Sequence, residues 1–174
     1  MAASQQTLRA AVFLGLSVDG RIARPDGDLE WLTSRGAAAG DAGFTPFVES
    51  VEAVVMGRRT YEAIASDEHW PYLDRPIHVI STSLAADGDP RITVHRSGEA
   101  VIDALQRDGY RRVYVDGGET IRWFLASKLV DELTLSHVPV LIGDGPSLFG
   151  PLGEDVHLKH VRTAVLDGGM VQTA

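Results

Sequence analysis

The stretch VYVDGGET, residues 113–120, runs from a short apolar segment into a pair of glycines. Val113 to Val115 predict a β-strand that is covered on both faces, because a short continuous apolar run is typical of buried parallel strands. Gly118 begins a predicted helix that extends to about Ser127. A strand that leads through a glycine turn into a helix is typical of α/β proteins, where ligands bind beyond the carboxyl ends of the strands.

Similar apolar runs lie on both sides of this stretch. They predict further strands over 9–16, 53–56, 77–80, 92–95 and 133–140. Helical patterns between them predict a mainly parallel central sheet covered by helices on both faces, which is a three-layer α/β fold. Runs over 157–165 and 170–173, around Asp167-Gly168-Gly169, predict an antiparallel C-terminal hairpin.

Local signals place the ends of several helices. Thr45 followed by Pro46 reads as an N-cap with proline at the first helical position. A second helix is expected over 60–65. Ser97 reads as the N-cap of a third helix, which Gly109 ends.

The composition excludes several classes of protein. The 174 residues carry Lys+Arg 16 against Asp+Glu 24, a net charge of −8 that disfavours nucleic-acid binding. Cys 0 excludes a disulfide scaffold, a thiolate zinc site and a cysteine nucleophile. No apolar run approaches the ~20 residues of a membrane-spanning helix, and the N-terminus lacks a signal-peptide core. We therefore expect one cytoplasmic domain over 1–174, without a membrane or metal partner.

Phosphate-compatible groups follow three successive predicted strands. Because the carboxyl ends of parallel strands meet at one edge, these groups are expected to form one anion-binding corner. The residues are Gly57, Arg58, Arg59, Thr60, Ser81, Thr82, Ser83, Gly117, Gly118, Glu119 and Thr120.

Each part of this corner has a physical reason to bind phosphate. Gly117 and Gly118 lack a Cβ, so the backbone there can approach a ligand closely. The helix that follows directs free N–H groups and its positive end toward an anion. Arg58 and Arg59 offer bidentate guanidinium groups. The pattern favours a dinucleotide, although a simple turn and a solvated arginine pair remain the alternatives.

Taken in order, the motifs resemble those of a known family. They are SVDGRIA at 17–23, MGRRTYE at 56–62, VIST at 79–82, VDGG at 115–118, LVDEL at 129–133 and PVLIG at 139–143. The chain resembles the dihydrofolate reductase superfamily, and within it the small bacterial proteins related to the reductase domain of riboflavin biosynthesis. The resemblance covers nearly the whole chain.

The resemblance implies a dihydrofolate-reductase-like fold, NADPH as hydride donor and a homodimer. The matching motifs of the family imply that residues 57–60 would bind the cofactor phosphates. They also imply that Ser81, Thr82 and Ser83 would contact the cofactor near the adenosine 2′-phosphate. Residues 117–120 would hold the pyrophosphate. Gly15 and Ile22 would flank the nicotinamide.

The sequence says less about the residues that would bind and protonate the substrate. Asp19 and Asp41 are candidate proton donors, although Asp19 could equally cap a turn. Trp31, Phe44 and Phe47 could line a substrate pocket or pack in the core. The segment 57–71 is nearer to the dihydrofolate reductase form than to the riboflavin-pathway form, and the deaminase partner domain is absent. The substrate is thus open between a pterin-like and a riboflavin-precursor-like heterocycle.

These features predict an NADPH-dependent reductase that transfers a hydride to a C=N or C=O group of a small heterocycle. A nucleotide-binding protein without catalysis would keep the same anion-binding corner and need no proton donor. A flavin- or folate-binding protein that uses the same cleft is a third hypothesis.

Overall fold

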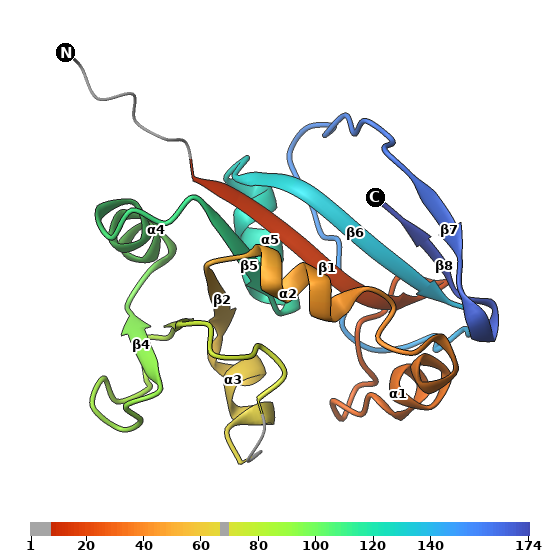
Figure 1. Ribbon diagram of the computed structural model, residues 1–174, viewed down its shortest axis with the longest axis horizontal. Coiled ribbons are helices and arrows are strands. Elements are labelled where there is room, and N and C mark those ends of the chain that lie inside the picture. The colour runs from red at the N-terminus through yellow and green to blue at the C-terminus, as the bar shows by residue number, and fades with distance from the viewer. Residues whose placement is uncertain (1–7, 67–69) are drawn as a thin grey trace.

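A single sheet organises the part of the chain that the structure, a computed structural model, describes, which is residues 8–66 and 70–174 (Figure 1). Its eight strands lie in the order β4-β3-β2-β5-β1-β6-β8-β7. Their bounds are β1 Arg9–Ser17, β2 Ala53–Gly57, β3 Ile77–Ile80, β4 Ile92–His95, β5 Arg112–Asp116, β6 Val130–Val138, β7 Thr163–Val165 and β8 Val171–Thr173.

The strands from β4 to β6 are parallel, and β8 and β7 add to the edge in antiparallel pairs. The predicted parallel sheet with an antiparallel C-terminal hairpin is confirmed. Because the six parallel strands run the same way, their carboxyl ends meet at one edge of the sheet. That edge includes Ser17, Gly57, Ile80 and Asp116.

Helices cover both faces, which confirms the three layers. The helices are α1 Glu30–Gly36, α2 Phe44–Ser50, α3 Arg58–Ile64, α4 Gly98–Arg107 and α5 Gly118–Ala126, with short 3₁₀ turns η1 Ala37–Ala39 and η2 Asp167–Gly169. Figure 1 shows α2 in front of the sheet and α5 behind it. Among the described residues, no helix combines the length and apolar character needed to cross a membrane.

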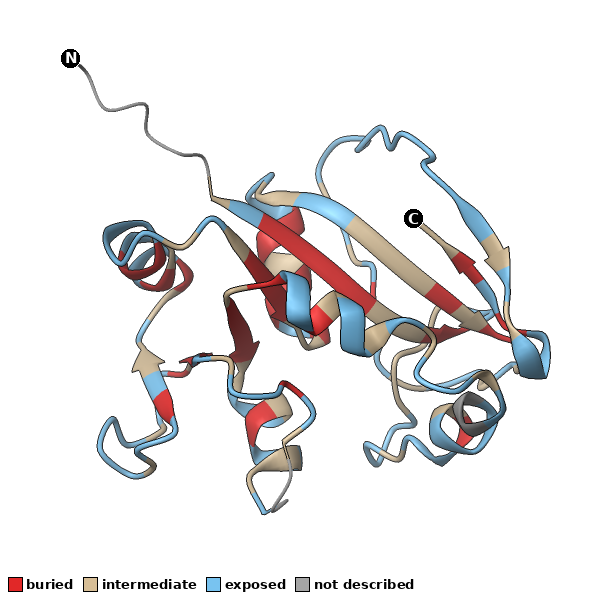
Figure 2. Cartoon of the chain, viewed as in Figure 1, coloured by how far each residue is buried: buried red, intermediate tan, exposed pale blue. Residues whose placement is uncertain are grey.

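Alternation along the strands supplies two separate cores, seen as the buried strands of Figure 2. On β5, Val113 and Val115 join the core under α4 and α5, whereas Tyr114 joins the core under α2 and α3. The same alternation divides Val12 from Phe13 on β1. Successive side chains of a strand point to opposite faces, so each central strand serves both layers.

Several predicted boundaries were wrong. The N-cap of α2 is Gly43, at φ 85°, and not Thr45. The Asp41 carboxylate accepts hydrogen bonds from the amides of Gly43 (2.9 Å) and Thr45 (3.1 Å), so the cap comes from upstream.

Two elements near the C-terminus also differ from the prediction. The long strand expected over 133–140 is β6, Val130–Val138, and the run from 157 pairs as a named strand only over Thr163–Val165. The start of β6 was missed because Asp131 and Glu132 interrupt its apolar pattern, and residues 161 and 162 hydrogen-bond to Ala174 outside the named strand β7. Ser97 does cap α4, accepting from the Ala100 amide at 3.2 Å as predicted.

Candidate functional site

A cavity of about 390 Å³ lies where β2 and β3 end and where α3, α4 and α5 begin. Most of the residues predicted for the anion-binding corner line it. The lining is Gly57, Arg58, Arg59, Ile80, Ser81, Thr82, Ser83, Gly98, Glu119, Thr120 and Trp123. We call this cavity the strand-end pocket. Its role in binding stays a prediction, but the fold brings these residues together.

Two of the arginines that line the pocket form solvent-exposed ion pairs. Arg58 pairs with Glu62 at 2.8 Å along α3, and Arg59 lies 3.6 Å from Glu119 on α5. The Arg59 and Glu119 side chains are 81% and 72% exposed. Exposed pairs of this kind contribute only about 0–1 kcal/mol, so either guanidinium could turn toward a stronger anion at little cost.

Backbone donors accompany these side chains. The helices α3 and α5 begin after Gly57 and Gly117, and neither N-cap residue provides a side-chain hydrogen bond. The first amides of each helix therefore have no intrahelical partner. Together with the hydroxyl groups of residues 81–83, they form a donor-rich surface suited to phosphate oxygens.

The glycine pair after β5 is required by neighbouring side chains of the protein itself. Gly117 has φ 85°, and a Cβ there would collide with Oγ1 of Thr60. A Cβ on Gly118 would collide with Cδ1 of Ile22. The turn thus packs against two residues that the sequence associated with the cofactor. Gly15 is separate, because Leu32 of α1 lies 2.5 Å from where its Cβ would be.

Asp19 is a structural latch in this arrangement. Its carboxylate accepts hydrogen bonds from Ser17 Oγ (2.7 Å) and from the amides of Ile142 (3.1 Å) and Gly143 (2.7 Å). These hydrogen bonds, that from Ser17 first, lower the pKa of Asp19 to about 2. Asp19 is therefore ionised at neutral pH and joins two segments that are distant in the sequence.

Asp41 is held in a similar way. The amide of Gly43, with Thr45, lowers its pKa below the ordinary value. Both predicted proton donors are thus carboxylates that bind backbone or hydroxyl groups. Their catalytic role stays a prediction, and their geometry favours a structural one.

A third acid, Asp116, has the opposite environment. It ends β5 directly before the glycine pair, and burial raises its pKa while hydrogen bonds oppose that rise. The Tyr72 hydroxyl donates to Oδ2 at 2.6 Å, and the Gly117 amide donates to Oδ1 at 2.7 Å. Asp116 lies within the motif VDGG, but the sequence prediction used only the two glycines of that motif and did not include the acid.

Two tyrosines that face this carboxyl group belong to a group of aromatic rings on the α2 face of the sheet. Phe44 packs against Tyr72 and Tyr114 with centroids 6.4 and 6.1 Å apart, and Phe47 lies 5.0 Å from Tyr114. We call Asp116, Tyr72, Tyr114, Phe44 and Phe47 the Asp116 cluster. The predicted substrate residues Phe44 and Phe47 therefore pack against the two tyrosines that face Asp116.

Trp31, the third predicted substrate residue, is not part of this cluster. It is buried in a separate core with Val138 and Met170, and its indole Nε1 has no hydrogen-bond partner there.

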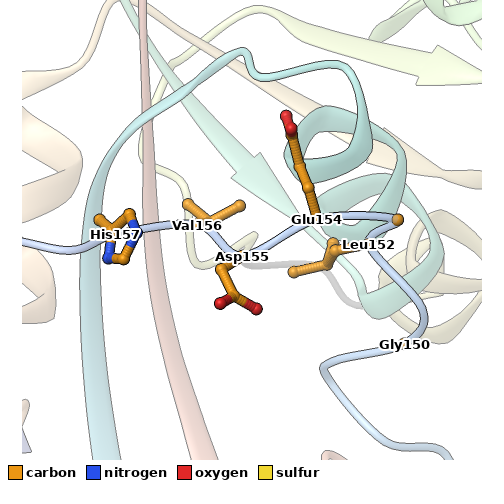
Figure 3. A pocket seen from close by; sticks show the side chains of 7 residues that line it. Gly150, Leu152, Glu154, Asp155, Val156 and His157 are labelled. Atoms are coloured by element: carbon orange, nitrogen blue, oxygen red, sulfur yellow. The ribbon is translucent and has the colours of Figure 1, made fainter.

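A second hollow, of about 630 Å³, is formed by residues 150–157 (Figure 3). Glu154 and Asp155 point in opposite directions within it, so their carboxylates do not converge. Glu154 is paired with Lys128. In the described ranges, no three His, Asp or Glu side chains are grouped as a metal site would require.

Comparisons with known proteins agree with this geometry. The family model of the RibD C-terminal domain matches residues 10–172. A candidate riboflavin biosynthesis protein from Shewanella sp. PV-4 is 32% identical, with a TM-score of 0.87, over 95% of this chain and 97% of that one. The uncharacterized protein YwjB of Bacillus subtilis is 29% identical over 154 residues, 87% of this chain and 88% of its own.

A more distantly related structure is that of a protein whose name states its enzymatic reactions. It is the diaminohydroxyphosphoribosylaminopyrimidine deaminase/5-amino-6-(5-phosphoribosylamino)uracil reductase of Thermotoga maritima. This chain covers 56% of that protein with 98% of its own length, at 14% identity and a TM-score of 0.66, a likeness that shows the fold alone. The chain belongs to the RibD C-terminal domain family, with the dihydrofolate-reductase-like fold of the riboflavin-biosynthesis reductases.

Proposed function

We propose that the protein is an NADPH-dependent reductase that transfers a hydride to a C=N or C=O group of a small heterocycle. The observation that carries the proposal is the strand-end pocket, where two guanidinium groups, three hydroxyl-bearing residues and two uncapped helix starts converge. Membership of the RibD C-terminal domain family supports the same class of reaction.

The residues present fit the phosphates of such a cofactor. Arg58 and Arg59 supply bidentate donors, and Ser81, Thr82 and Ser83 supply hydroxyl groups. The ring of Trp123 and the side chain of Ile80 give the same pocket an apolar wall that suits a flat base. NADPH, when bound, would supply the hydride.

The chain's own contribution to the chemistry would be a proton. Asp116 is the acid whose pKa is raised by burial, so it retains a proton to higher pH than Asp19 or Asp41. A general acid works best when its pKa lies near the working pH. We assign proton delivery to Asp116, and loop positioning to Asp19.

The pocket is tested by replacing both Arg58 and Arg59 with alanine. NADPH affinity, measured by calorimetry, is expected to fall about tenfold or more, and NADH affinity by less, because the 2′-phosphate loses its charged partners. Arg107→Ala is the matched control, because Arg107 pairs only with its neighbour Asp108 at the end of α4. Equal losses for both dinucleotides would refute the assignment.

Catalysis is tested separately. The wild-type protein is expected to oxidise NADPH in the presence of 5-amino-6-(5-phosphoribosylamino)uracil or a pterin, and Asp116→Asn to do so far more slowly. Binding of NADPH with no oxidation by any C=N or C=O heterocycle would favour the rival hypothesis of a nucleotide-binding protein without catalysis.

We also propose a homodimer that forms through the C-terminal edge of the sheet. Val165 on the edge strand β7 is 78% exposed, and Leu158 and Val161 in the segment before it are 69% and 73% exposed. An exposed apolar edge strand is a template for association. Light scattering is expected to report a dimer, and Val161→Asp with Val165→Asp a monomer; a wild-type monomer would contradict the proposal.

A further inference from the structure

Tyr72 reaches the end of β5 from a turn that contributes nothing to the strand-end pocket. Its hydroxyl donates to Asp116 Oδ2 at 2.6 Å, across 44 positions of sequence. The Tyr72 side chain is buried, and its ring lies 6.0 Å from that of Tyr114. Since the Gly117 amide binds the other oxygen, both oxygens of the carboxyl group have a fixed donor.

The turn that carries Tyr72 has one left-handed residue and is anchored by two hydrogen bonds. Leu73 has φ 54°, a left-handed conformation that is unfavourable for a residue with a branched side chain. Arg75 donates from Nε to the Val48 carbonyl (3.2 Å) and from a terminal nitrogen to the Glu49 carbonyl (2.9 Å), at the end of α2. Strained residues persist where the surroundings over-determine them, so this turn is built to place its tyrosine.

We propose that Tyr72 is a positioning residue that acts through Asp116, fixing the orientation of its carboxyl group and controlling its exchange of a proton. The inference rests on the proposed function, in which Asp116 delivers the proton. A hydroxyl that donates to a carboxylate stabilises the ionised form, whereas burial favours the neutral form. Tyr72 therefore makes a half-buried acid able to lose its proton as well as to keep it.

Few other groups act on this carboxyl group. The titratable groups that face it are Tyr72 and Tyr114, and both remain neutral because burial raises their pKa values well above the ordinary range. The Tyr114 hydroxyl donates to the Phe13 carbonyl at 2.8 Å. The neighbouring strand places Met56 beside Asp116, and α2 contributes the rings of Phe44 and Phe47. None of these carries a charge. The Tyr114 hydroxyl also lowers the pKa of Asp116, but it donates its hydrogen bond to Phe13, so Tyr72 is the tyrosine whose hydroxyl donates to the carboxyl group.

The test follows the ¹³Cγ chemical shift of Asp116 by NMR as the pH is varied, in the full chain without cofactor. Tyr72→Phe removes the hydroxyl and keeps the ring, so the midpoint of Asp116 is expected to move upward by about one pH unit. Tyr61→Phe is the matched control. Its hydroxyl donates to a different carboxylate, Asp89, at 2.9 Å within the same core, so the Asp116 midpoint should stay in place.

An unmoved midpoint in a folded Tyr72→Phe protein would overturn the inference. If that variant does not fold, the ¹³Cζ shift of Tyr72 in the wild type decides: it must titrate with the Asp116 midpoint, and an independent course refutes the coupling. Because neither readout needs NADPH, a coupled pair in a protein that does not bind NADPH would confirm the coupling of Tyr72 to Asp116 and refute the proposed function.

Discussion

The strand-end pocket and the Asp116 cluster lie along the same edge of the sheet and are built in opposite ways. In the pocket, Arg59 and Glu119 are mostly exposed and only loosely paired. In the cluster, Asp116 has two short hydrogen bonds among buried rings. The proposed phosphate site therefore has exposed charges that can rearrange, whereas the proposed proton donor has a fixed hydrogen-bond donor on each carboxyl oxygen.

The largest effect on stability is expected at the glycine turn, which connects the two regions. Gly117→Ala is expected to lower the free energy of unfolding by about 3 kcal/mol, because the φ of 85° is unfavourable for alanine and its Cβ would collide with Thr60. Urea denaturation measures the change. Gly153→Ala is the control, since its φ is 77° but no atom lies within 4 Å of its Cβ. An equal loss in both variants would show that the collision with Thr60 is unimportant.

His78 is a buried titratable residue outside both regions, and it provides a reference for the effect of burial on a pKa. His78 packs against His95 with ring nitrogens 2.9 Å apart, and burial first, then His95, lowers the pKa of His78 to about 4. Its contribution to stability is therefore present above the unfolded pKa of about 6.5 and is lost as the pH falls toward about 4.

The wild type should lose about 2 kcal/mol more stability than His78→Phe between those two pH values. Unfolding by urea at a series of pH values measures this difference. Parallel pH profiles for the two proteins would contradict the prediction.

Salt concentration should affect ligand binding in the strand-end pocket much more than the titration of Asp116. Raising NaCl from about 0.05 M to about 0.5 M shortens the Debye length from above 10 Å to below 5 Å. NADPH affinity, which depends on exposed arginines, is expected to fall several-fold. The Asp116 midpoint, set by hydrogen bonds and burial, should move by less than about 0.2 pH units. A midpoint as salt-sensitive as the affinity would place Asp116 in solvent.

The smallest effect is expected at the mouth of the pocket. Glu119→Gln removes the carboxylate that competes with phosphate for Arg59, so NADPH affinity should rise about two- to threefold. Glu62→Gln offers the matching change for Arg58. A weaker affinity in Glu119→Gln would instead mean that the carboxylate orients Arg59 for the ligand.

The strand-end pocket could be predicted because its residues are local to strand ends, and a parallel sheet brings such ends together. The Asp116 cluster could not, because Tyr72 meets Asp116 only through a turn whose course depends on a left-handed Leu73 and on Arg75. Apolar residues with helical spacing did not distinguish Phe44, in the Asp116 cluster, from Trp31, in a separate core. The cap of α2 was missed because Gly43 takes the N-cap position and Asp41 reaches across it.

The latch formed by Asp19 has a consequence for the order of folding. It joins residues 123 and 124 positions apart, at Ile142 and Gly143. The entropy of closing so long a loop is already lost when β1 and β6 pair side by side, from Ala10 with Val130 to Ser17 with Val138. The latch therefore follows the completed sheet at little further cost. Slow hydrogen exchange at the Gly143 amide would mark only those molecules whose two longest strands have already met.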